Sequence, residues 1–313
     1  MRKEVSVQKR LGVIGVPSSA AAFAPGQEKA PAALRGAGLI ERLGAAGIEV
    51  ADHGDRAVWR WRPDRANPTA QNVDAVVEIA VDTARRVREV VAAGEVALVL
   101  GGDCTVEIGT VAGHFPGEER IGLLYFDLHP DLNVPAAVRE GALDWMGVAH
   151  LLGEDGAAEP LSRVGPRFPL LDPADLLLFA YGPEQSTPRE REAMERLGID
   201  RVPVAEVAAD PEGAAAAAVA RIADRCDRLL VHFDIDVIDF TDAPLSEETG
   251  RNQGLTLDQA LRALRVLLAS ERLSAVTITE LNPDHGDEEG VMLDRLVAGL
   301  VAALAGPPSP RAH

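Results

Sequence analysis

Residues able to bind metal ions occur at alternate positions in two short segments of this chain. Asp127, His129 and Asp131 form the first segment, and Asp234 and Asp236 form the second. On an extended backbone alternate side chains face the same way, so each set can converge on one point. Carboxylates combined with imidazole suit hard to borderline divalent cations, Mn²⁺ above all, with Zn²⁺ as a further candidate. The spacing therefore predicts a metal site.

Both segments follow apolar runs that are typical of buried strands. Four such runs end in polar residues: residues 97–100, 123–126, 229–233 and 275–279 lead to Cys104, Asp127, Asp234 and Glu280. In open parallel sheets, ligands bind outside the carboxyl ends of the strands. We therefore expect these strand ends to meet at one site.

The expected site is rich in negative charge. Several aspartates facing one point would repel one another unless cations lay between them. Two divalent ions would balance four carboxylates, and two-metal sites commonly activate a water as a nucleophile. A single Asp after a strand is more often a cap or a turn residue. Repetition at several strand ends instead favours a hydrolase that holds two divalent metal ions.

The elements that position these residues alternate between strands and helices, which predicts an α/β fold with a mostly parallel sheet. The expected strands cover residues 11–16, 48–51, 97–100, 123–126, 176–180, 201–204, 229–233 and 275–279, and the main helices residues 32–46, 72–93, 211–226, 256–269 and 290–304. Continuous buried runs with uneven spacing favour an open, doubly wound sheet of roughly eight strands over a closed barrel. Residues 1–305 are expected to form a single domain, and residues 306–313 a short Pro-rich tail.

Composition narrows the class of partner. The 313 residues include 49 Asp and Glu against 31 Lys and Arg, a net charge of −18. Binding to nucleic acid or to an anionic membrane needs clustered basic residues, so a small-molecule substrate is expected instead. Two cysteines without a disulfide framework and no evident signal peptide or long apolar run predict a cytoplasmic protein.

Four motifs make the chain similar to the ureohydrolase family of arginase, agmatinase and formiminoglutamase. Residues 127–131 resemble its D-A-H-x-D, residues 280–283 its E-x-N-P, and residues 101–105 its G-G-D-H-S, with Cys104 in place of the histidine. Residues 232–239 resemble its S-x-D-x-D-x-x-D, with His232 in place of the serine. The resemblance implies an arginase-like three-layer α/β/α sandwich, a binuclear manganese site, hydrolysis of a carbon–nitrogen bond, and a homo-oligomer, either a trimer or a hexamer.

The resemblance also implies a ligand set for two metal ions. Asp127 and Asp234 would bridge the ions. The remaining ligands would be Cys104 and Asp131 on one metal, and His129 and Asp236 on the other.

It further implies which residues act in the reaction. Asp131 is one of them, and Glu280 would face the cationic guanidinium of a substrate through a bidentate ion pair. Asn133 matches the residue that holds the substrate's α-carboxylate in arginase, and Thr249 matches a hydroxyl near the guanidino group after a short insertion.

Cys104 is the main departure from the family pattern. A thiolate is softer than imidazole, which shifts metal preference from Mn²⁺ toward Zn²⁺. A neutral thiol would instead bind the metal weakly, and most free cysteines are simply small buried hydrophobes. The hydroxyarginine hydrolase of D-cycloserine biosynthesis, a relative in this family, is similar in having Cys there.

A second departure concerns proton transfer. Met146-Gly147 is interpreted as occupying the place of the family's His-Gly pair, whose histidine relays protons. Methionine cannot do this, so His150 or His285 would have to substitute, although a lone histidine is more often structural.

A third departure concerns the substrate. Gln185 and Thr187 occupy places where arginases use acidic groups for the α-amine, which argues against arginine. Trp145 and the segment at residues 59–61 could reshape the pocket, although packing is the commoner role of such residues.

Three functions remain open from the sequence. The first is a metal-dependent hydrolase of guanidino-, hydroxyguanidino- or formimino-type molecules. The second is a catalytically weak or inactive relative that acts as a binding or scaffolding subunit. The third is a metal-dependent deacylase, which the D-x-D pair and Glu280 make less favoured.

Overall fold

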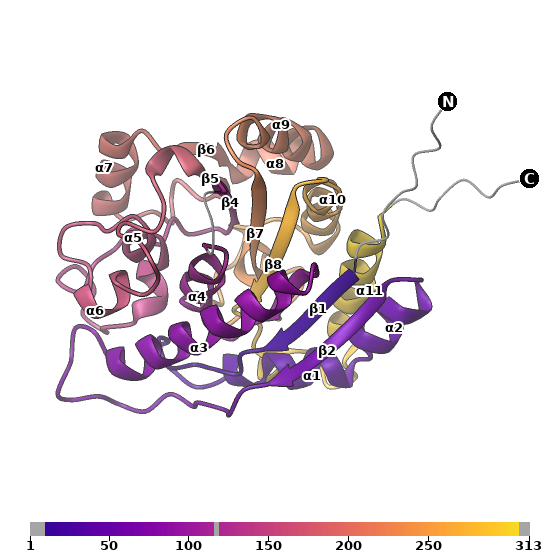
Figure 1. Ribbon diagram of the computed structural model, residues 1–313, viewed down its shortest axis with the longest axis horizontal. Helices are drawn as coiled ribbons and strands as arrows, with labels where there is room; N and C mark the ends of the chain where they lie inside the picture. The colour runs from indigo at the N-terminus through magenta and orange to yellow at the C-terminus, as the bar shows by residue number, and fades with distance from the viewer. Residues whose placement is uncertain (1–9, 116–118, 307–313) are drawn as a thin grey trace, which may run out of the picture.

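A computed structural model describes residues 10–115 and 119–306 of the chain. Eight strands form one sheet in the order β2-β1-β3-β8-β7-β4-β5-β6 (Figure 1). All seven strand pairings are parallel, which confirms the predicted parallel sheet. The strands are β1 (Arg10–Gly15), β2 (Glu49–Asp55), β3 (Val96–Leu100), β4 (Ile121–Phe126), β5 (Leu176–Tyr181), β6 (Asp200–Pro203), β7 (Arg228–Asp234) and β8 (Leu273–Thr279).

Helices cover both faces of the sheet because the strand side chains are apolar on both. In β7, Leu229, Val231 and Phe233 join one apolar core, whereas Leu230 joins the other. The first core is completed by α1 (Ala30–Gly36), α2 (Leu39–Ala45), α8 (Val204–Ala209), α9 (Pro211–Ala223), α10 (Leu257–Leu268) and α11 (Val291–Ala305). The second is completed by α3 (Val73–Ala92), α4 (Val106–Gly113), α5 (Gly147–Leu151), α6 (Glu159–Ser162) and α7 (Pro188–Leu197). The predicted three-layer α/β/α arrangement is confirmed.

Several elements differ from the sequence prediction: α4 to α8 were not predicted, and α9 ends at Ala223, three residues before its predicted end. The helix expected over residues 32–46 is two helices, α1 and α2, separated at Gly38, whose φ of 80° is left-handed. Glycine adopts this conformation without the steric cost that other residues meet. Strand β2 continues to Asp55, four residues beyond its predicted end, and pairs with β1. Of the Pro-rich tail, residues 307–313 lie outside the described residues.

The strand order explains how distant segments form one site. Strands β3, β8, β7 and β4 are consecutive in the sheet and parallel. Their carboxyl ends therefore place Cys104, Glu280, Asp234 and Asp127 along one edge. Within the described residues, none of the helices combines the length and apolar character needed to cross a membrane.

Candidate metal centre

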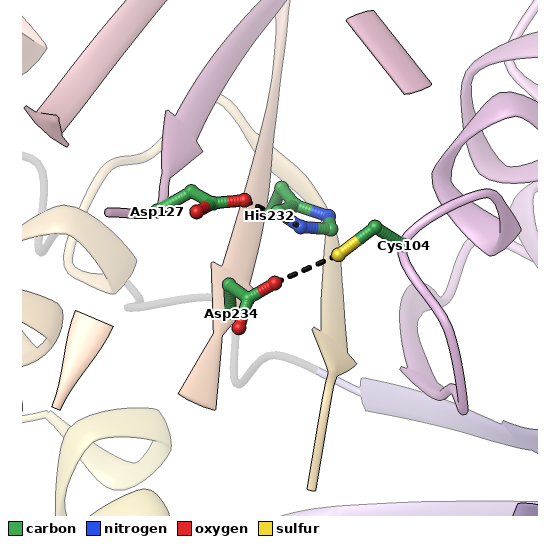
Figure 2. A group of neighbouring side chains, drawn as sticks. All are labelled: Cys104, Asp127, His232 and Asp234. Carbon is green, nitrogen blue, oxygen red and sulfur yellow. Dashed lines mark hydrogen bonds and ion pairs between the residues drawn. The ribbon is translucent and has the colours of Figure 1, made fainter. Parts of the chain in front are cut away.

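Four buried side chains at this edge bring their donor atoms together (Figure 2). The Cys104 thiol, one nitrogen of His232 and carboxylate oxygens of Asp127 and Asp234 all lie within 4.8 Å of one another. Cys104 comes from the loop after β3, Asp127 directly follows β4, and His232 and Asp234 belong to β7. Three of these residues belong to the ligand set that the family resemblance implies, and His232 does not.

A second group of donors shares Asp127 with the first. Asp127, His129 and Asp236 each have a potential ligand atom within 4.8 Å of those of the other two. His129 Nδ1 lies 2.8 Å from Asp236 Oδ2 and 3.7 Å from Asp127 Oδ1. Two adjoining groups with one shared carboxylate form a candidate binuclear site. Asp131 lies outside both groups but lines the same cavity and accepts a 2.6 Å hydrogen bond from the Tyr125 hydroxyl.

The loop that carries Cys104 is held against neighbouring chain segments. Asp103 accepts hydrogen bonds from the Ser18 hydroxyl at 3.2 Å and from the Thr105 hydroxyl. A Cβ at Gly102 would lie 1.7 Å from the Ser18 carbonyl oxygen, so only glycine permits this approach. Asp131 and Glu280 have left-handed φ angles of 51° and 60°. Such backbone conformations are costly for these residues and cluster at functional sites.

Burial and mutual repulsion dominate the electrostatics of the site. Burial raises the pKa of Asp127, Asp131 and Asp234 well above the usual range, and neighbouring carboxylates raise the pKa of Asp127 and Asp234 further. Burial alone would lower the pKa of His129, but its ion pair with Asp236 outweighs burial and raises that pKa to about 9. The same pair lowers the pKa of Asp236 despite burial.

Cys104 forms a hydrogen bond within the cluster. Its Sγ donates to Asp234 Oδ2 at 2.7 Å and lies 3.5 Å from Thr279 Oγ1. Burial, followed by the charge of Asp234, raises the pKa of the Cys104 thiol well above its usual value. A metal ion inverts this effect, because a coordinating thiol loses its proton. The position of Cys104 is thus compatible with metal binding, and it is more than a small hydrophobe in an apolar core.

The two groups lie in a cleft of about 750 Å³, part of which is open to solvent. Of its described lining residues nine are acidic, and none is Lys or Arg. The lining residues are Phe23, Cys104, Asp127, His129, Asp131, Asn133, Asp144, Trp145, Gln185, Thr187, Glu190, Asp234, Asp236, Glu247, Glu248 and Glu280. Such a cleft favours cationic occupants.

Of the residues predicted to contact the substrate, Glu280 and Asn133 line this cleft and Thr249 does not. The Glu280 carboxylate accepts hydrogen bonds from the Cys104 backbone N–H at 3.1 Å and from Gln27 Nε2 at 2.9 Å. Asn133 Oδ1 accepts a 3.0 Å hydrogen bond from the Thr187 hydroxyl, which orients the amide. Thr249 is exposed and is not among the described lining residues, whereas the preceding Glu247 and Glu248 are.

Neither histidine considered for proton transfer lines the cleft. His150 is fully buried, with Nδ1 2.6 Å from the Met146 carbonyl oxygen and Nε2 accepting from the Ala158 N–H at 3.1 Å. Both of its ring nitrogens are therefore used by the backbone. His285 Nδ1 lies 2.8 Å from the Ser246 carbonyl oxygen. These contacts indicate structural roles for both.

The segment before α5 contributes two side chains to the cleft. Met146 packs in an apolar core, whereas Asp144 and Trp145 line the cleft. Asp144 lines the cleft although it was not predicted from the sequence. Burial and then Glu280 raise its pKa well above the usual range. Trp145 reaches the cleft beside Phe23, with 5.9 Å between ring centroids, whereas residues 59–61 are not part of the described lining.

Comparison with known proteins agrees with this architecture. The sequence pattern of the arginase family matches residues 9–306. The chain belongs to the arginase family. The arginase of Brevibacillus brevis is 28% identical over 303 residues, which cover 96% of this chain and 99% of the relative. Arginase-1 of Mus musculus is 30% identical over 293 residues, which cover 90% and 87% respectively.

Two solved structures are also similar to this chain. The arginase from Bacillus caldovelox matches this arginase-family chain with a TM-score of 0.85 at 27% identity, over 96% of this chain and 99% of that one. Formimidoylglutamase from Bacillus subtilis shares the fold, with a TM-score of 0.73 at 17% identity, over 95% and 86%. The family uses a binuclear divalent metal centre, and the two donor groups described above are the candidate for it here.

The donor chemistry fits two divalent ions. Asp236 Oδ1 is buried and has no hydrogen-bond partner among the described residues. Leaving such a group unsatisfied costs about 1–3 kcal/mol, and more for a charged group. A cation at this position would satisfy the oxygen and would offset the repulsion among the carboxylates.

The metal-free protein should lose stability as the pH rises from about 4, the unfolded pKa of an aspartate, toward neutral and mildly alkaline pH. Asp127, Asp131 and Asp234 have raised pKa values in the fold. Their stabilising contribution is present below the unfolded pKa of about 3.9 and is lost as the pH rises through the folded pKa. Thermal unfolding after chelation, followed across this range, measures the effect.

Adding Mn²⁺ at the upper end of the range should restore the melting temperature, because the metal binds the deprotonated ligands. A metal-free melting temperature that stays constant or rises with pH would contradict this account.

Proposed function

We propose that this arginase-family protein is a metal-dependent hydrolase of a guanidino-, hydroxyguanidino- or formimino-type small molecule. The observation that carries the proposal is the pair of donor groups joined by Asp127 at the floor of an acidic cleft. Asp127 and Asp234 would be shared between two ions. The other ligands would be Cys104 and Asp131 on one side, and His129 and Asp236 on the other.

The metals and the protein residues would contribute different parts of the reaction. Two divalent ions, when bound, would activate a water as the nucleophile and would balance the carboxylate charge. Glu280, held in place by Cys104 N–H and Gln27, presents its carboxylate to a cationic guanidinium or amidinium. The oriented amide of Asn133 offers its N–H groups to the distal end of the substrate. Asp144 is a second carboxyl group that can hold a proton at the cleft wall.

The proposed substrate is cationic at its reacting end. No Lys or Arg lines the described part of the cleft, so a strongly anionic molecule would find no basic partner there. Gln185 and Thr187 are neutral, which removes the acidic partner that arginine's α-amine would need. Phe23 and Trp145 add an aromatic rim.

An activity panel tests the proposal. The purified protein is loaded with Mn²⁺ or, separately, with Zn²⁺ and assayed for release of urea or ammonia from guanidines, hydroxyguanidines and formimino compounds. We expect metal-dependent hydrolysis of at least one cationic compound other than L-arginine, and its loss after chelation.

Silence across the panel with two ions bound would overturn the proposal. It would favour a non-catalytic, metal-binding relative, for which the Cys104–Asp234 hydrogen bond is the motivating observation. The Cys104→His variant then separates the two functions, because a gain of activity would show that the remaining machinery is intact.

A further inference from the structure

His232 is a fully buried histidine that the function proposed above does not use. It lies in β7, opposite Tyr125 of β4 and Thr277 of β8. Its ring stacks on that of Tyr125, with centroids 4.0 Å apart and an interplanar angle of 1°. The stacking and the sheet fix the ring in place. Figure 2 shows the imidazole between Asp127 and Cys104.

The Nε2 atom of His232 faces the donor group of the metal centre. It lies 4.0 Å from Asp127 Oδ2 and 3.2 Å from the Thr279 hydroxyl. The Cys104 thiol and an Asp234 oxygen lie within 4.8 Å of the other donors. Two ligand atoms, each about 2.1 Å from one ion, are at most about 4.2 Å apart. The separation from Asp127 is therefore compatible with a shared ion.

The other ring nitrogen has the partner that a metal-bound histidine needs. His232 Nδ1 lies 3.4 Å from Oε2 of Glu107, a buried residue of α4. Metal-ligating histidines almost always donate this second N–H to a carboxylate, a carbonyl or water, which leaves the first nitrogen free to bind. Glu107 Oε1 has no hydrogen-bond partner among the described residues. Burying the Glu107 carboxylate is costly unless it has a partner. A role in orienting His232 as a metal ligand accounts for its presence here.

We propose that His232 is a metal ligand beside Cys104 and that Glu107 is the positioning residue that orients it. The proposal rests on the metal centre of the proposed function and adds a ligand to it. Cys104 replaces the histidine that the family pattern has at this position. His232 of β7 would then provide an imidazole ligand to the same half of the site. The metal nearest to Cys104 would be held by thiolate, imidazole and carboxylate, a mixed donor set suited to Zn²⁺ or Co²⁺ as well as Mn²⁺.

Metal binding by the full-length protein tests the proposal. Wild type, His232→Gln, His232→Ser and Glu107→Gln are stripped of metal, titrated with Co²⁺ and assayed for bound metal by elemental analysis. We expect both His232 variants to lose at least about 100-fold in affinity for one of two ions, and Glu107→Gln to lose about 10–100-fold. In wild type, a thiolate-to-cobalt charge-transfer band should report Cys104, and its position should shift in Glu107→Gln.

A substitution at a buried histidine away from the metal centre serves as the control. His114→Gln removes another fully buried histidine, which contacts Thr110 and Ser274 and lies outside both donor groups, and should leave metal binding unchanged. If folded His232 and Glu107 variants bind two ions as tightly as wild type, with an unchanged cobalt spectrum, His232 is not a ligand, although the metal centre stands. If wild type itself binds no metal, the proposed function fails as well.

Discussion

The Asp127→Asn variant should lose both metal ions and at least about 1000-fold in kcat/KM, which corresponds to about 4 kcal/mol of transition-state stabilisation. Asp127 is the residue that the two donor groups share, so neutralising it weakens both sites at once. The variant keeps the shape of the side chain and an oxygen that can accept the 2.6 Å hydrogen bond from the His129 N–H. Elemental analysis and steady-state kinetics measure the two losses.

The stability of the metal-free variant separates lost chemistry from lost folding. Burial and repulsion by Asp234 and Asp236 raise the pKa of Asp127, so its charged form destabilises the metal-free fold. Metal-free Asp127→Asn should therefore melt at or above the temperature of metal-free wild type at pH of about 8. Retention of two tightly bound ions in this variant would contradict the shared role of Asp127.

The Glu280→Gln variant should retain both metal ions and lose about 100- to 1000-fold in kcat/KM for a cationic substrate. Removing one partner of a buried charge pair costs about 2–5 kcal/mol, and each factor of ten corresponds to about 1.4 kcal/mol. The amide oxygen can still accept a hydrogen bond from the Cys104 N–H or from Gln27. The loss should therefore come from the missing charge and not from a displaced loop.

Two measurements distinguish these causes. Metal content should stay at the wild-type value and the melting temperature should not fall in Glu280→Gln, while a competitive guanidinium inhibitor should bind more weakly. Activity within about threefold of wild type, a change below about 1 kcal/mol, would show that Glu280 does not pair with the substrate.

Much of the fold follows from local sequence patterns. Continuous apolar runs mark the strands of a parallel sheet, and polar residues after β3, β4, β7 and β8 mark the edge where ligands bind. The order of these strands in the sheet is what joins the four ends, and no local pattern encodes that order. The division of the first helical region at Gly38 was missed because a single glycine is often tolerated within a helix.

The site residues that were missed depend on contacts between distant segments. His232 was noted only as the replacement for the family's serine, because nothing in the local sequence shows that Glu107, 125 positions away, lies beside its ring. Asp144 was overlooked because the segment after Asn133 is irregular and has no periodicity that fixes which side chains face the cleft. Thr249 lies in a similarly irregular segment, so the sequence pattern does not fix whether its side chain faces the cleft.

Anomalous scattering from a crystal of the Mn²⁺-loaded protein would show whether Asp127 joins two metal ions. We expect two peaks per chain at the manganese edge, roughly 3.5–4 Å apart. Asp127 should lie between them, with Cys104 at one ion and His129 at the other. A crystal grown with excess Mn²⁺ that shows no peak among these residues, or a single peak elsewhere, would contradict the account.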